Sequence, residues 1–298
     1  MTKGGAMTDQ TFNRTIEDLG NIVDLGHVNV TVIDQGVATA YYITGLGLTR
    51  DPYLMTGTNN MWANVGRSQF HLPTRPDAQV IQGITGLVIP NRAALLARLE
   101  GVREELADTQ FDFKETNDAV ETTCPWGNRI DCHTPDEARF GRMTLGMAYV
   151  KFDVPVGAAA GIERFYSDIF GAVSKTTERK GTPCAEVQAG ERQWLYFQET
   201  EAPRIPYDDN HIQFYINDFS GPYDKLMERG LIYQESNQHQ YRFKDVVDPE
   251  SDEPIYTLDH EVRSMGHPMY ARQLVNRNPS ISLRAYEPGR ESAHWTNG

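Results

Sequence analysis

Apolar and polar residues alternate along four short stretches of the chain, and each stretch leads into a segment with helical spacing of its apolar residues. The clearest copy is HVNVTVID from His27, followed by the helical QGVATAYYITGLGL. YVKFDVPV from Tyr149, followed by GAAAGIERFYSDIFGA, repeats the same order of strand, helix, aromatic pair and final glycine. Weaker copies begin at Ile84 and His211. The pattern predicts an internal fourfold repeat.

Each predicted helix is followed by short β-type runs that turn residues separate. The first repeat contains MWANVG and SQFHLP, and the second closes with CPWGNRIDCH. The third repeat contains GERQWLYFQET, and the fourth contains YRFKDVVDPE and EPIYTLDHEV. Each unit is therefore predicted to be one strand, one helix and about three further strands. The edge strands of a unit could pair with another unit or with a second copy of the chain, so a homodimer is possible.

The length of the chain and its polar, proline-containing segments predict a division into domains. A chain of 298 residues suggests about two domains. We expect an α+β fold with two domains, each built from paired βαβββ units. The predicted N-terminal domain covers 20–142 with units 25–74 and 82–135, the C-terminal domain covers 146–275 with units 147–200 and 210–264, and 276–298 forms a tail.

Charge and cysteine content narrow the class of protein. The 41 acidic residues outnumber the 28 basic ones, which gives a net charge of −13 and disfavours nucleic acid as a general partner. The three cysteines are widely spaced and form no CxxC pair, as is typical of a reducing compartment. No stretch has the apolar length of a signal sequence or a membrane span, so we expect a cytoplasmic protein without a membrane partner.

The fourfold βαβββ unit, with its His-first strand and its aromatic-Tyr helix ending in Gly, resembles the vicinal oxygen chelate superfamily. This superfamily includes glyoxalase I, extradiol dioxygenases, fosfomycin-resistance enzymes and bleomycin-binding proteins. The run CPWGNRID looks like the family's DP-x-GN-x-I-E, and the resemblance extends over roughly 25–263. It implies that paired units form a cupped mixed sheet. Metal ligands would come from the first and last strands of each unit and point into the cup.

The resemblance also implies particular ligand positions. In the order of the four units they are His27 and His71, Ile84 and Asp131, Tyr149 and Gln198, and His211 and Tyr256. The N-terminal half would then hold a divalent metal through His27, His71 and Asp131. Two imidazoles and one carboxylate suit Fe(II), and they also admit Mn, Ni or Zn. Open coordination positions would let a small-molecule substrate chelate the metal through vicinal oxygens.

Other residues are candidates for catalysis or substrate binding. His133 shares the strand face of Asp131 and is the best candidate for a general base, although an exposed strand-end histidine is the commoner role. Gln69 shares the face of His71 and could bind substrate, although an ordinary polar strand residue would look the same. Tyr149, His211 and Tyr256 would line the C-terminal cup, where extradiol dioxygenases have their metal, so the choice of cup stays open.

Two functions fit these observations. The first is a metal-dependent enzyme acting on a small vicinal-oxygen chelator, either an extradiol ring-cleaving dioxygenase or a glyoxalase-like lyase or isomerase. The second is a metal-free small-molecule-binding protein that resembles the bleomycin-resistance members. Metal content separates the two, because only the enzyme depends on an ion bound by the histidines.

Overall fold

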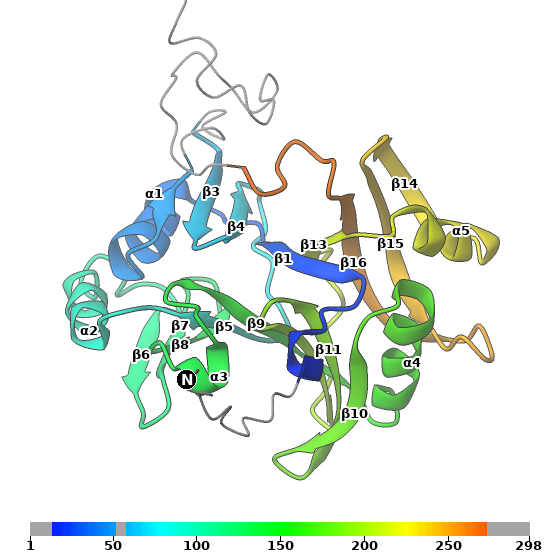
Figure 1. Cartoon of the computed structure of the whole chain (residues 1–298). Helices are drawn as coiled ribbons and strands as arrows, with labels where there is room; N and C mark the ends of the chain where they lie inside the picture. The colour runs from blue at the N-terminus through cyan, green and yellow to red at the C-terminus, as the bar shows by residue number, and fades with distance from the viewer. Residues whose placement is uncertain (1–13, 52–57, 273–298) are drawn as a thin grey trace, which may run out of the picture.

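The computed structural model describes residues 14–51 and 58–272, and it folds into two eight-stranded sheets (Figure 1). We call them sheet I and sheet II. From edge to edge, sheet I contains β14 (Ile232–Asn237), β15 (Gln240–Val247), β16 (Pro254–Ser264), β13 (His211–Ile216), β1 (Ile22–Asn29), β4 (Ser68–Pro73), β3 (Asn60–Val65) and β2 (Thr49–Arg50). Sheet II contains β10 (Ser174–Arg179), β11 (Thr182–Gly190), β12 (Gln193–Thr200), β9 (Gly146–Pro155), β5 (Gly83–Val88), β8 (Arg129–His133), β7 (Val120–Thr123) and β6 (Asp112–Glu115).

The helices belong to the same repeated units as the strands. Figure 1 shows α1 and α2 on one side of the molecule and α4 and α5 on the other. The helical segments are η1 (Arg14–Glu17), α1 (Gln35–Ala38), the π-helical η2 (Thr39–Gly45), α2 (Arg92–Gly101), α3 (Glu137–Phe140), α4 (Ala159–Phe170) and α5 (Ser220–Glu228). In the described part of the chain, no helix is both long and apolar enough to cross a membrane.

The predicted α+β fold with paired βαβββ units is confirmed, but the predicted pairing of neighbouring units is wrong. Sheet I joins the first unit to the fourth through the antiparallel pair β1–β13, and sheet II joins the second to the third through β5–β9. Neither 20–142 nor 146–275 therefore contains a complete sheet, and 276–298 lies outside the described residues. Each unit presents the same open edge on its first strand, so the repeat pattern does not specify which copy completes the sheet.

Strand alternation separates an apolar face from a polar face in both sheets. In β9, Val150 and Phe152 are buried, whereas Tyr149 and Lys151 on the opposite face are partly exposed. The apolar faces pack against the helices: α4, for example, buries Phe165 against Phe243. The two sheets meet where β1 contacts β11 and where β4 contacts β9.

Candidate metal centre

Three histidines from three adjacent strands of sheet I form the central cluster. Asn29 of β1 lies opposite His71 in the parallel pair with β4 and opposite His211 in the antiparallel pair with β13. His27 precedes Asn29 by two residues and therefore shares its face. Each of the three histidines offers one ring nitrogen, and these nitrogens lie within 4.8 Å of one another. The structure thus gathers residues of the first and fourth units into one potential ligand set.

The burial of the cluster fits a bound metal ion. Within the described ranges, the Nε2 atoms of His27 and His211 have no hydrogen-bond partner although both are buried. Buried polar atoms are nearly always partnered, so an ion between these rings would account for the exception. Nε2 of His71 lies 2.9 Å from Oδ1 of Asn60. Because an amide oxygen can only accept a hydrogen bond, Nε2 of His71 is the donor, and Nδ1 of the same ring keeps its lone pair.

Burial and neighbouring positive charges keep the three imidazole rings neutral, which is the form that binds metals. Burial lowers the pKa of His27 and of His211 well below the usual value, and neighbouring Arg263 and Arg242 add to the effect. Burial also lowers the pKa of His71 to about 3. All three imidazoles are therefore neutral at physiological pH, with a lone pair free on each. The donor set suits a first-row transition metal.

A carboxylate lies next to the cluster on β16. Glu261 is opposite Gln213 in the β13–β16 pair, and its Oε2 lies 3.7 Å from Nε2 of His211. Its charge is compensated by Arg263, 2.5 Å from Oε1, and by Arg242, 3.3 Å from Oε2. The two arginines hold this carboxylate beside His211 through charge-assisted contacts.

The structure does not bring Asp131 to His27 and His71, so the predicted ligand set is not assembled. Asp131 lies on β8 of sheet II, because the second unit pairs with the third. Its Oδ2 lies 3.2 Å from the hydroxyl of Tyr149, and that hydroxyl lies 3.0 Å from Nε2 of His133. Asp131, His133 and Tyr149 thus form a separate hydrogen-bonded group. The candidate base His133 is in this group, not beside the three histidines.

The other predicted substrate-binding residues are divided between the two faces of sheet I. Gln69 lines a cavity beside His27, and its amide nitrogen donates to Oδ2 of Asp51 at 2.7 Å. Tyr256 lies on the opposite face, where its ring packs near Phe197 in the core. Glu261 lies beside His211, so it occupies the place on the last strand that the family resemblance gave to Tyr256.

Two cavities flank the histidine cluster. A cavity of about 190 Å³ is lined by His27, Gln69 and Gln213, and one of about 360 Å³ is lined by His71 and His211. Gln213 is fully buried, and its amide atoms have no partner among the described residues. Sequence reasoning missed Gln213, although strand alternation places it on the same face as His211. Its free amide can bind a ligand that enters beside His27.

Comparison with known proteins supports the fold. No family model matches the chain, and no curated protein matches it either. Among solved structures, a "putative dioxygenase" from Bacillus subtilis has 13% identity and a TM-score of 0.56, with 94% of this chain and 96% of that chain covered. Glyoxalase I from Zea mays has 10% identity and a TM-score of 0.55, with 80% and 92% covered. The chain therefore shares its fold with these two proteins.

Proposed function

We propose that the protein is a metal-dependent enzyme that acts on a small molecule with two neighbouring oxygen atoms. His27, His71 and His211 would hold the ion. The observation that carries this proposal is the pair of buried, unpartnered Nε2 atoms on His27 and His211, in rings whose low pKa keeps them neutral. Three protein ligands leave open positions for a chelating substrate.

A bound ion would act as a Lewis acid that stabilises negative charge on the substrate oxygens. The residues around it supply the rest of the site. Gln213 would orient the substrate through its free amide in the cavity beside His27. Glu261, whose carboxylate lies close to His211, would replace His133 as the candidate proton acceptor. Arg242 and Arg263 would keep that carboxylate aimed at the cup.

Within this class, ring-cleaving dioxygenase and glyoxalase-like lyase or isomerase remain the two candidate reactions. One solved structure that shares the fold is described as a "putative dioxygenase" and another as glyoxalase I. The preference for Fe(II) came from the carboxylate of Asp131, which lies in sheet II. A set of three imidazoles suits iron, nickel or zinc. Assays with catechols and with thiol adducts of oxoaldehydes, each with these three metals, would separate the two reactions.

Metal analysis tests the proposal directly. Protein purified without chelator should carry a transition metal in stoichiometric amount, and His71→Ala and His211→Ala should each lose it. Asp131→Asn is the matched control, because it alters a ligand candidate in sheet II and should retain the metal. A wild-type protein without metal, and without thermal stabilisation by Fe(II), Ni(II) or Zn(II), would contradict the proposal and leave a metal-free binding protein. Loss of metal in Asp131→Asn alone would move the site to sheet II.

A further inference from the structure

A third cavity lies where the two sheets meet, away from the three histidines. It has a volume of about 240 Å³. Sheet I contributes Asp24 of β1 and Arg67 from the β3–β4 turn, and sheet II contributes Met147 of β9 and Gln193 of β12. The segment between α3 and β9 forms a third wall. We call this space the junction cavity.

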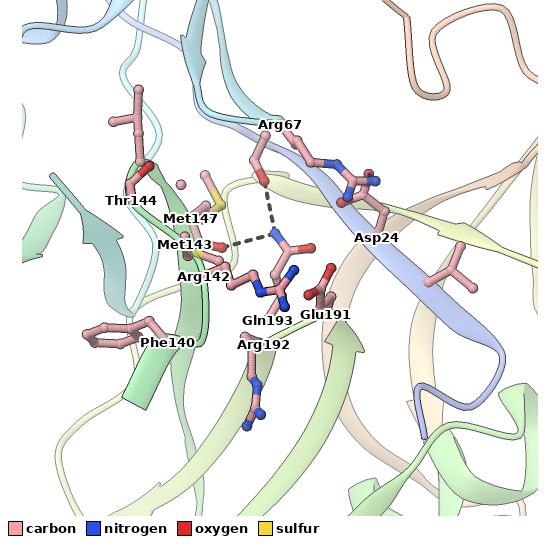
Figure 2. Close-up of a pocket in the computed structure, with 14 residues that line it drawn as sticks. Asp24, Arg67, Phe140, Arg142, Met143, Thr144, Met147, Glu191, Arg192 and Gln193 are labelled. Carbon is pink, nitrogen blue, oxygen red and sulfur yellow. Dashed lines mark hydrogen bonds and ion pairs between the residues drawn. The ribbon is translucent and has the colours of Figure 1, made fainter. Parts of the chain in front are cut away.

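The floor of the junction cavity is held rigidly by Gln193. Its amide oxygen accepts from the backbone N–H of Leu25 at 3.0 Å, and its amide nitrogen donates to Oγ of Ser68 and to the carbonyl of Met147, both at 3.0 Å. Figure 2 shows Gln193 at the centre of the view, with Arg67 above it and Arg142 and Arg192 below it. A floor fixed in this way reduces the ordering cost of binding a ligand.

The charge of the cavity lining is opposite to that of the chain. Three guanidinium groups line the cavity, against the two carboxyl groups of Asp24 and Glu191. Burial raises the pKa of Asp24 to about 6, so this carboxyl is partly neutral near pH 6. Within 14–51 and 58–272, Arg142 and Arg192 make no ion pair, whereas Arg67 lies 3.5 Å from Asp24. Two cations therefore remain available in a protein of net charge −13.

The remaining walls are apolar. Phe140, Met143 and Met147 lie beside the arginines in the lining. Guanidinium groups bind carboxylates through paired hydrogen bonds. Transfer of an aromatic ring from water to contact with apolar side chains is favourable. The cavity is smaller than the roughly 300–1,000 Å³ that drug-sized ligands occupy, so a single ring with a short chain is the appropriate size.

We propose that the junction cavity binds a small organic anion, with its carboxylate between Arg142 and Arg192 and its apolar group against Phe140, Met143 and Met147. Asp24 and Arg67 also line the cavity beside His27, so an occupant of the junction cavity touches residues shared with the proposed substrate cavity. The site is separate from the three histidines, because none of them lines the junction cavity.

Titration with 3-phenylpropionate tests this proposal in the full-length, EDTA-treated protein, where metal binding plays no part. Calorimetry should show one saturable site, and the uncharged amide 3-phenylpropionamide should bind at least tenfold more weakly. The double variant Arg142→Gln/Arg192→Gln should also weaken binding of the carboxylate at least tenfold. Glutamine is chosen because it removes the charge and adds no branch at Cβ, which matters at Arg192, where φ is 59°.

The matched control is Arg103→Gln/Arg229→Gln, which changes the net charge equally at positions outside the cavity and should bind like the wild type. No saturable binding, equal affinity for carboxylate and amide, or equal affinity in the two double variants would each overturn the proposal. Because the protein is metal-free throughout, these results do not depend on whether the three histidines hold an ion.

Discussion

The imidazole rings of His27 and His211 lie 5.5 Å apart, across the antiparallel pair β1–β13 that joins the first repeat to the fourth. Neither residue could approach the other if neighbouring repeats formed each sheet. The candidate metal centre is thus a consequence of the pairing of units: His27 and His71 come from one unit, and the third histidine comes from the unit farthest away in the chain.

Replacing Arg263 by glutamine should strongly destabilise sheet I. The side chain of Arg263 is almost fully buried and forms an ion pair with Glu261, so the substitution leaves a buried carboxylate with less compensation. We expect a loss of about 3 kcal/mol in the free energy of unfolding. Urea denaturation of the EDTA-treated protein measures it.

The control for this change is Lys114→Gln, which removes the exposed ion pair between Lys114 and Glu121. Exposed ion pairs contribute little to stability, so we expect the free energy of unfolding to change by no more than about 0.5 kcal/mol. Equal effects of the two substitutions would show that Arg263 has no special role in compensating charge beside the histidines.

Gln193 is predicted to hold the two sheets together, and Gln193→Ala should lower stability. Its side chain is buried and bonds to Leu25 and Ser68 of sheet I and to Met147 of sheet II. Truncation removes these three buried hydrogen bonds, which should cost about 2–4 kcal/mol. Gln198→Ala on the same strand is the control, because among the described residues its amide nitrogen bonds to Arg179 and Thr182, both in sheet II. A smaller loss for Gln193→Ala than for Gln198→Ala would contradict the prediction.

The repeat itself, its elements and two of the three clustered histidines could be predicted from sequence. His27 opens the alternating run HVNVTVID and His71 lies in the last β-type run of the first unit, so both follow from position within a repeat, although β1 itself spans Ile22–Asn29. The partner of each unit could not be predicted, because all four first strands present similar edges. Asp131 was placed with His27 for that reason, and it lies beside Tyr149 instead.

Register within the last strand was the second obstacle. Alternation along a strand predicts which face of the sheet a residue occupies. It does not predict the register, and so it does not show which residue of the strand lies beside the three histidines. In β16 that level is fixed by pairing with β13, where Gln213 lies opposite Glu261. Tyr256 is five positions earlier on a strand that runs from Pro254 to Ser264, and it faces the core.

Asp24 should make the protein less stable as the pH rises from about 4 to about 6. Burial raises its pKa from 3.8 to about 6 in the folded state, so the folded protein binds the proton more tightly than the unfolded chain. The stabilisation is complete below the unfolded pKa and is lost as pH rises through the folded value. It amounts to about 2–3 kcal/mol.

Asp24→Asn removes this titration. As the pH rises from 4 to 7, the free energy of unfolding of the variant should therefore increase by about 2–3 kcal/mol relative to that of the wild type. Urea midpoints across this range measure the difference, with the exposed Asp108→Asn as a baseline. A parallel pH dependence of wild type and Asp24→Asn would contradict the prediction.

His260 should produce the opposite dependence, a loss of stability in acid. Its ring is fully buried, stacks on Phe243 with centroids 4.2 Å apart, and lies 2.6 Å from the hydroxyl of Tyr166 through Nε2. Burial lowers its pKa from 6.5 to about 3, so the unfolded chain takes up the proton first. The stabilisation is complete above pH 6.5 and is lost as pH falls toward 3.

His260→Gln keeps an acceptor for Tyr166 but cannot take up the proton. Between pH 7 and pH 4.5 the free energy of unfolding of the wild type should fall by about 2–3 kcal/mol more than that of the variant, whatever the substitution costs at pH 7. Each pKa unit corresponds to about 1.4 kcal/mol. The readout is the slope of unfolding free energy against pH, measured on metal-free protein so that the other histidines contribute equally to both. Identical slopes would mean that His260 takes up a proton as readily in the folded state as in the unfolded chain, which its stacking against Phe243 and its burial both oppose.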